Sequence, residues 1–172
     1  MTPPLSTKQH TLRRLLPADA ALYHAVRLEG ISRHPNQFRI AVEDEAGLPI
    51  ERVAERLASA WVVGGFAGAT LEGIGGISRF DGAKLRHKAL LFGMYVREGA
   101  RGTGLSGAIV EALLTEARVM GVDQVILTLA ADNTRARRLY ERWGFEQYGI
   151  EPRAIKVGSD YFDEALMTHR LV

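Results

Sequence analysis

Three glycines spaced as G-x-G-x-x-G could bring a phosphate group against the main chain. They are Gly102, Gly104 and Gly107, within the segment RGTGLSG of residues 101–107. Glycine has no Cβ, so the backbone around it can approach an anion closely. An amphipathic pattern begins directly after the turn, and the first amides and the dipole of a helix favour a bound phosphate. We therefore expect a phosphate-binding turn here rather than a merely flexible loop.

The same spacing occurs in dinucleotide-binding Rossmann domains, where the first strand runs almost straight into the first glycine. Here residues 97–101 separate the preceding apolar run from Gly102. Asp132 is a loose match for the acidic residue expected about 20 positions further on, and no third strand–helix unit follows. A Walker-type loop has less support, because no Lys-Ser or Lys-Thr follows the glycines. A Rossmann-type dinucleotide-binding protein stays an alternative that the spacing does not favour.

Arginine is concentrated close to this turn, although the formal net charge is only +2. Such a small net charge does not indicate a nucleic-acid partner, and we expect none. Most arginines in helical segments lie on solvated faces, but one or two near a phosphate turn could meet the anion. The six candidates are Arg97, Arg101, Arg135, Arg137, Arg138 and Arg142.

Length and composition indicate one domain over residues 1–172, with 47% hydrophobic and 24% charged residues. Cysteine is absent, which excludes disulfides, thiol catalysis and Cys-ligated metal. The spacing of His24, His34 and His169 does not indicate a metal site either, so we expect no metal. No apolar run reaches the roughly 18–20 residues of a membrane span, and the N-terminal segment lacks the apolar core of a secretory signal. We expect a cytoplasmic protein with no membrane partner.

Hydrophobic periodicity predicts six or seven strands and four helices in a mixed sheet. A strand–helix–strand order around the glycine turn predicts a parallel pair with a right-handed crossover. The run 89–96 has little alternation and is expected to be buried on both faces. Gly30, Gly121 and Gly144 are expected to end helices, and residues 32–47 follow no regular pattern. The predicted strands are 11–16, 61–66, 70–80, 89–96, 124–130, 145–151 and 160–172, and the predicted helices are 17–30, 49–60, 105–120 and 134–143.

Residues 89–145 resemble the core of the GNAT superfamily of acetyl-CoA-dependent N-acetyltransferases. The family's phosphate motif is R/Q-x-x-G-x-G/A, which residues 101–106 match, with Ser106 at the position where Gly or Ala is preferred. Serine is small, so we expect a minor effect of this departure. A second pattern, N-x-x-A-x-x-x-Y-x-x-x-G-F, is matched by Asn133, Ala136, Tyr140, Gly144 and Phe145. The resemblance covers residues 11–172 in outline, and the N-terminal third matches only by pattern.

The resemblance implies an α/β (α+β) fold whose mixed, mostly antiparallel sheet of six to seven strands is splayed in the middle and flanked by about four helices. It implies that acetyl-CoA lies in the split as co-substrate. The diphosphate would bind the amides of Arg101, Gly102, Thr103, Gly104, Leu105 and Ser106. The pantetheine arm would pair with Met94, Tyr95 and Val96, and Asn133 would contact that arm while it also caps the next helix.

The resemblance also implies transfer of an acetyl group to a primary amine of a small molecule or a peptide N-terminus by direct attack. A backbone N–H near Met94 or Tyr95 would stabilise the oxyanion. Tyr140 would give a proton to the leaving thiolate, because a tyrosine with its ordinary pKa of about 10 is protonated at neutral pH. From spacing alone, Tyr140 would be a core aromatic on a stripe with Leu139 and Trp143.

A general base is not singled out by the sequence. The candidates are Glu72, Asp81, His87 and the acidic group Glu43, Asp44 and Glu45. The alternative to an enzyme is a CoA-binding or regulatory module without turnover. Homodimers are common among relatives, so a homodimer is possible, and the acceptor stays unassigned.

Overall fold

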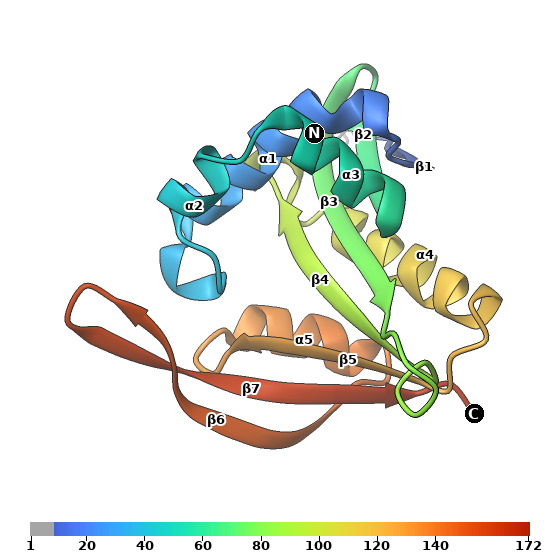
Figure 1. Ribbon diagram of the computed structural model, residues 1–172, viewed down its shortest axis with the longest axis vertical. Coiled ribbons are helices and arrows are strands. Elements are labelled where there is room, and N and C mark those ends of the chain that lie inside the picture. The colour runs from blue at the N-terminus through green and yellow to red at the C-terminus, as the bar shows by residue number, and fades with distance from the viewer. Residues whose placement is uncertain (1–8) are drawn as a thin grey trace, which may run out of the picture.

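A seven-stranded sheet that parts between β4 and β5 organises the chain (Figure 1). The computed structural model describes residues 9–172. The strand order is β1-β2-β3-β4-β5-β7-β6, and within the described residues β4 and β5 form the one parallel pair. This confirms the predicted fold class and the predicted parallel pair. The strands are β1 (Thr11–Arg14), β2 (Trp61–Ala67), β3 (Thr70–Arg79), β4 (Lys88–Val96), β5 (Gln124–Ala130), β6 (Glu146–Val157) and β7 (Asp160–Arg170).

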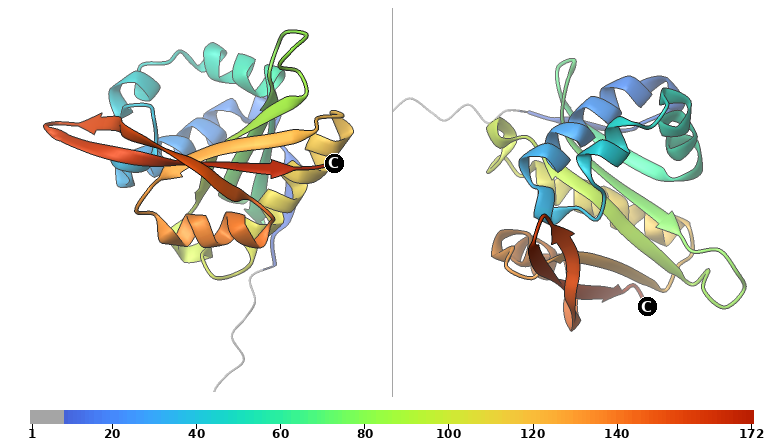
Figure 2. Two further views of the ribbon diagram at one scale, coloured as in Figure 1. Left: turned by 90° about the horizontal axis from the view of Figure 1, so that it is seen from below. Right: turned by 60° about the vertical axis from the view of Figure 1, so that its left-hand side comes forward.

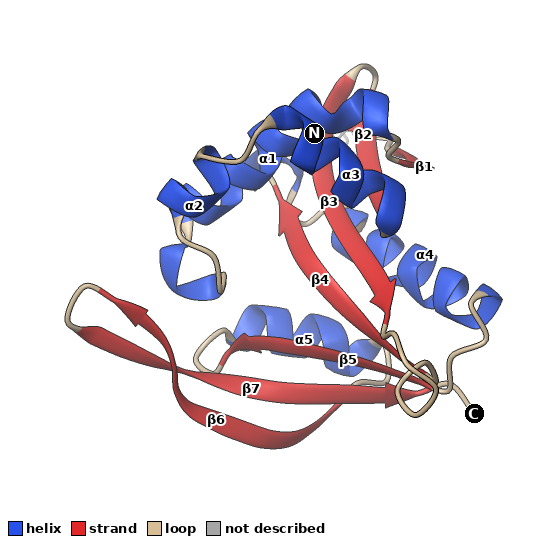
Figure 3. Ribbon diagram, in the orientation of Figure 1, coloured by secondary structure: helices blue, strands red, loops and turns tan. Residues whose placement is uncertain are grey.

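Helices cover both faces of the sheet (Figures 2 and 3). One core joins α1 and α3 to β2 and β3, and a second core joins α4 to β5, α5 and β7. The helices are α1 (Ala20–Arg33), α2 (Val42–Ala46), α3 (Ile50–Ser59), α4 (Leu105–Val119) and α5 (Thr134–Arg142), with short 3-10 turns η1 (Pro17–Asp19), η2 (Pro35–Gln37) and η3 (Glu98–Ala100). The expected count of four helices is therefore one too low, because α2 and η2 lie in the stretch that was predicted to be irregular.

The split in the sheet follows from how little of β4 pairs with β5. Pairing joins only residues 88–90 of β4 to residues 124–126 of β5, and beyond them the strands diverge (Figure 1). Opposite β3, Tyr95 faces Ile74 and Phe92 faces Gly76, so β4 carries one extra residue at Gly93–Met94. Gly93 has a φ of 64°. A bulge of this kind bends its strand, which favours the divergence of β4 from β5.

The prediction that residues 89–96 are buried on both faces is confirmed only in part. Leu90, Phe92 and Met94 are only partly buried, whereas Ala89, Leu91 and Tyr95 are buried. Leu91 and Met94 pack in the core with α4, whereas Phe92 and Tyr95 pack in the core with α1 and α3. Phe92 and Met94 are only partly buried because they also line the cavity between β4 and β5.

Gly30 does not end its helix, contrary to the prediction. Helix α1 continues to Arg33, and Gly30 packs against the ring of Tyr95. A Cβ at Gly30 would lie 2.8 Å from Tyr95 Cγ. Glycine stands here because a helix and β4 approach each other closely, which local sequence does not reveal.

We expect Gly30→Ala to destabilise the protein by about 1–3 kcal/mol, the usual cost of an overpacked core. On an exposed helix face, a Gly-to-Ala substitution would instead stabilise the protein by up to about 1 kcal/mol. The sign of the change in unfolding free energy therefore shows whether Gly30 packs closely against Tyr95. Urea unfolding measures the effect, and Ser32→Ala at an exposed position of the same helix is the control. A more stable Gly30→Ala protein would contradict the close approach.

The two helices that flank the site begin where the sequence predicts and end one residue earlier than predicted. The stripe of α4 is buried at Leu105, Ile109, Leu113 and Ala117. Gly121 and Gly144 follow the helix ends with positive φ, at 68° and 84°. Asn133 caps α5, since its Oδ1 accepts a hydrogen bond from the Ala136 amide at 3.1 Å.

Residues 1–8 lie outside the described part, and the prediction about a secretory signal falls largely on them. Among residues 9–172, no helix combines the length and the apolar character that crossing a bilayer requires.

Candidate functional site

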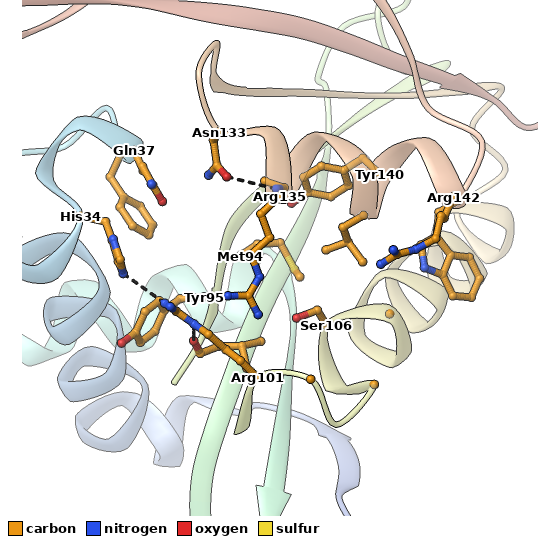
Figure 4. A pocket seen from close by; sticks show the side chains of 18 residues that line it. His34, Gln37, Met94, Tyr95, Arg101, Ser106, Asn133, Arg135, Tyr140 and Arg142 are labelled. Carbon is orange, nitrogen blue, oxygen red and sulfur yellow. Dashed lines mark hydrogen bonds between the residues drawn. The ribbon is translucent and has the colours of Figure 1, made fainter. Parts of the chain in front are cut away.

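A cavity of about 430 Å³ lies where the end of β4, the glycine turn and α5 meet (Figure 4). A smaller cavity of about 100 Å³ continues from it between β4 and β5. Met94, Asn133 and Tyr140 line both cavities. The site therefore runs from the phosphate turn into the split of the sheet.

The glycine turn is shaped to present main-chain amides. Gly102 and Gly104 have φ values of 74° and 87°, and a Cβ on either would meet open space. Gly104 is the N-cap of α4, and no side chain caps this helix. The first amides of a helix have no partner within it, so those of Leu105 and Ser106 remain available. Such a turn fits a diphosphate, because free amides and the helix dipole both favour an anion.

Three of the six candidate arginines, Arg101, Arg135 and Arg142, line the larger cavity. Arg101 Nη2 lies 3.2 Å from His34 Nε2, and Arg101 Nε donates to the Val96 carbonyl at 3.3 Å (Figure 4). Burial, and then the charges of Arg101 and Arg33, lower the pKa of His34. A neutral His34 can accept the hydrogen bond from Arg101, which holds this guanidinium beside the turn.

The other three arginines have different surroundings. Arg97 Nε donates to Glu29 Oε2 at 2.9 Å, and Arg137 Nη2 donates to the Ala131 carbonyl at 2.6 Å. Arg138 is exposed on α5.

Tyr140 belongs both to the core and to the cavity wall. Its ring packs edge-on against Phe145 with 5.6 Å between centroids, and the residue is only 5% exposed. Burial raises the pKa of Tyr140 above the ordinary value, so the hydroxyl stays protonated across the neutral range. The two roles considered for this residue are thus compatible, since the ring packs while the side chain also lines the cavity.

The structure brings most of the predicted site residues to the larger cavity. These are Met94, Tyr95, Val96, Arg101, Gly102, Gly104, Ser106, Asn133 and Tyr140. Two predicted residues do not line it. The Thr103 hydroxyl donates to the Ala100 carbonyl at 2.6 Å, and Leu105 is a buried core residue. Only the main-chain amides of these two residues could serve a ligand.

Several cavity residues escape sequence reasoning. His34, Gln37 and Phe38 come from the segment between α1 and α2, which carries no periodic signal. Gly93 lines the smaller cavity, and nothing in the apolar run predicts its bulge. The role of His34, Gln37 and Phe38 becomes visible only in the fold, where the segment of residues 34–41, which we call the strap, lies beside the split (Figure 1).

The six candidate bases line neither cavity. Glu45 is fully buried, and Arg27 Nε and Arg56 Nη1 donate to its Oε1 at 2.9 and 2.7 Å. Burial alone would raise the pKa of Glu45, but hydrogen bonds and charge from Arg56 and Arg27 lower it. This carboxylate stabilises the packing of α2 on α1 and α3.

The remaining candidates are also away from the cavities. Glu72 is buried beside His10, with Oε2 2.7 Å from Nε2. Asp81 and His87 lie in the β3–β4 connection at the closed end of the split, and Glu43 and Asp44 are exposed on α2. Across residues 9–172, no group of three or more His, Cys, Asp or Glu side chains is placed to hold a metal ion.

Comparison with solved structures shows a shared fold at low sequence identity. A GNAT-family acetyltransferase from Streptococcus pneumoniae superposes with a TM-score of 0.85 at 22% identity, covering 95% of this chain and 100% of that one. A putative acetyltransferase from Salmonella typhimurium, solved with its cofactor acetyl-CoA, superposes with a TM-score of 0.79 at 18% identity, covering 95% of both chains.

Curated relatives include proteins named mycothiol acetyltransferase. The one from Brachybacterium faecium is 28% identical over 147 residues, which are 81% of this chain and 42% of the relative. The one from Beutenbergia cavernae is 44% identical over 61 residues, which are 32% of this chain and 20% of the relative. This chain therefore spans less than half the length of the curated relatives that it matches.

A family profile also matches the chain. The profile described as "Acetyltransferase (GNAT) family" matches residues 22–145, which include both motifs, the split of the sheet and the two cavities. Because this match covers most of the chain and agrees with the fold, the protein belongs to the GNAT family of acetyltransferases.

Proposed function

We propose that the protein transfers an acetyl group from acetyl-CoA to a primary amine by direct attack, with residues 1–172 as one domain and residues 89–145 as its acetyl-CoA-binding core. The observation that carries the proposal is a single continuous site with three parts. An uncapped glycine turn, the open edge of β4 and the side chain of Tyr140 all border the same pair of connected cavities.

In this proposal, main-chain groups provide much of the binding site for acetyl-CoA. The amides of residues 101–106 and the side chains of Arg101, Arg135 and Arg142 would hold the diphosphate. Beyond Leu90, the edge of β4 that faces the split has no partner strand among the described residues. An extended ligand can add to such an edge by main-chain hydrogen bonds, which suits the pantetheine arm along Met94, Tyr95 and Val96. Asn133 stands at the opposite wall.

Acetyl-CoA supplies an activated thioester carbonyl. The amine nitrogen forms a bond to the carbonyl carbon, the carbon–sulfur bond breaks, and the amine proton passes to solvent. A main-chain N–H at Met94 or Tyr95, beside the Gly93 bulge, would donate to the oxygen as negative charge grows. Tyr140 would then give its phenolic proton to the leaving sulfur, and the phenolate would regain a proton from solvent before the next turnover.

Acetyl-CoA calorimetry and an amine panel test the proposal together. We expect acetyl-CoA to bind while NAD does not, and at least one primary amine to release free CoA thiol from the complex. Binding without thiol release for every amine would favour the alternative, a CoA-binding or regulatory module without turnover. Absence of acetyl-CoA binding would overturn both the proposed acetyltransferase and the CoA-binding module.

The relatives named mycothiol acetyltransferase make a mycothiol precursor amine one member of that panel. Because those relatives have low identity to this chain and are covered only in part, we propose only the chemical class of the acceptor, a primary amine.

A further inference from the structure

The inner cavity beside Tyr140 is lined by uncharged side chains. Aromatic and aliphatic groups from the strap, β4 and β5 form most of its wall, among them Phe38, Phe92 and Leu129. Its polar groups are side-chain amides and hydroxyls, including Thr128 of β5. An amine that reaches the thioester from this side therefore leaves water for an environment without a counter-charge in the described wall.

Asp132 and Glu141 adjoin wall residues in the chain but line neither cavity, and the carboxylate of Glu164, across the sheet from the wall, is already paired. Arg39, which follows Phe38 in the strap, donates from Nε to Glu164 Oε2 at 2.7 Å and from Nη2 to Glu151 Oε2 at 2.7 Å. Glu164 stands opposite Ala130, a residue of the cavity wall, and is only 2% exposed. Glu164 is buried whereas Arg39 is exposed, and because this carboxylate already accepts a hydrogen bond from Arg39 it is not free to pair with a substrate ammonium.

The charged groups on the opposite side of the site are cationic. Arg101 and Arg135 line the larger cavity. Burial and the charge of Arg101 lower the pKa of His34, the first residue of the strap, and so favour its neutral form. These side chains suit phosphate oxygens and supply nothing that would stabilise an ammonium ion.

We propose that the acceptor is a weakly basic amine of the α-amino type, as in a peptide N-terminus or an amino-acid amide, and not an alkylamine such as a lysine side chain. The inference rests on the proposed acetyl transfer and specifies its substrate class. A site with an uncharged wall selects the neutral form of the amine, because burying an unpaired ammonium is costly. An amine that has lost its proton in solution needs no base within the cavity.

The size of the preference follows from the ordinary pKa values of the two amine types. At pH 7.5 an α-amine of pKa about 8 is roughly one-quarter neutral, whereas an alkylamine of pKa about 10.4 is neutral in about one molecule in 800. The ratio of these fractions is about 200-fold. Greater nucleophilicity of the more basic amine recovers part of this factor, so we expect kcat/KM to favour the α-amine by at least about 30-fold.

Glycinamide and n-butylamine, which are of similar size, are the probes. With butylamine, kcat/KM should rise about tenfold per pH unit from pH 7 to 9, whereas with glycinamide it should level off above about pH 8. Equal kcat/KM values at pH 7.5, or a preference for butylamine, would overturn the inference while leaving acetyl transfer intact. No thiol release with either amine or with the panel would overturn acetyl transfer, and this inference with it.

Thr128→Asp and Thr128→Asn form a matched pair that tests the cause. Thr128 is exposed on β5 and lines the inner cavity, so both variants should fold. The aspartate would offer a carboxylate to an ammonium, and we expect butylamine kcat/KM at least about tenfold higher in the Asp than in the Asn variant. Glycinamide should differ little between them. Equal butylamine values in two folded variants would show that charge in this wall does not select the amine.

Discussion

Tyr140→Phe should lower kcat by about a hundredfold or more, which is the usual contribution of a positioned proton donor. The substitution keeps the ring that packs on Phe145 and removes only the hydroxyl. Acetyl-CoA affinity should therefore stay nearly unchanged. Thiol release measures turnover, and calorimetry with acetyl-CoA measures binding.

The control is Tyr148→Phe, which removes a hydroxyl from an exposed position of β6. This variant should match the wild type in both assays. Equal turnover of Tyr140→Phe and wild type would remove the acid role from Tyr140 and leave it as a packing residue.

The pH dependence of kcat should also reflect the role of Tyr140 as a proton donor. Tyr140 must be protonated to donate, and burial raises its pKa above the ordinary value of about 10. The active form therefore persists to higher pH than for an exposed tyrosine. Wild-type kcat should not fall between pH 8 and 9.5, and a decline in that window that disappears in Tyr140→Phe would contradict the raised pKa.

Gly104→Val should abolish measurable acetyl-CoA binding, with an affinity loss of about thirtyfold or more. Gly104 has a φ of 87°, and its Cβ would project into open space at the start of α4. In that position valine adds bulk where the diphosphate approaches the helix amides. Valine also strains the turn, because a β-branched residue in the left-handed region costs on the order of 1–3 kcal/mol. Calorimetry with acetyl-CoA measures the loss.

Gly82→Val separates backbone strain from ligand contact. Gly82 has a φ of 89°, open space around its Cβ, and a place in the exposed β3–β4 connection away from both cavities. Both variants should lose similar thermal stability, and only Gly104→Val should lose acetyl-CoA. Equal acetyl-CoA affinities in the two variants would show that the glycine turn does not hold the diphosphate.

The two catalytic-site variants also separate binding from chemistry. Loss of turnover without loss of affinity in Tyr140→Phe, together with loss of affinity in Gly104→Val, would place the two functions at opposite ends of the same site. An enzyme requires both ends, whereas a CoA-binding module requires only the glycine turn.

Local physics explains why parts of this protein are predictable from sequence. The tight turn at Gly68 between the predicted strands 61–66 and 70–80, the buried stripe of α4 and the Asn133 cap of α5 each depend on residues within a few positions of one another. The phosphate turn is of the same kind, because Gly102 and Gly104 adopt positive φ whatever lies across the sheet. Family membership could be predicted because two such local motifs flank one strand.

Other features depend on elements that are distant in sequence. Gly30 is explained by the ring of Tyr95, and the partial exposure of Met94 is explained by a bulge and by the early end of pairing with β5. Glu45 was a candidate base until the fold placed Arg27 and Arg56 around it. In each case the deciding contact is with a helix or a strand that no pattern around the residue identifies.

The sequence by itself determined the glycine turn, the helix that follows it, the tyrosine helix and hence the family, because hydrogen bonding and side-chain periodicity act over short distances. Only the tertiary structure decided where the sheet opens, that the strap of residues 34–41 closes the inner cavity, and that Arg39 neutralises Glu164 beside it. These features form the wall that the proposed amine acceptor would meet, and they arise from packing between segments up to 125 residues apart. Close packing is a property of the assembled chain, so no shorter segment contains it.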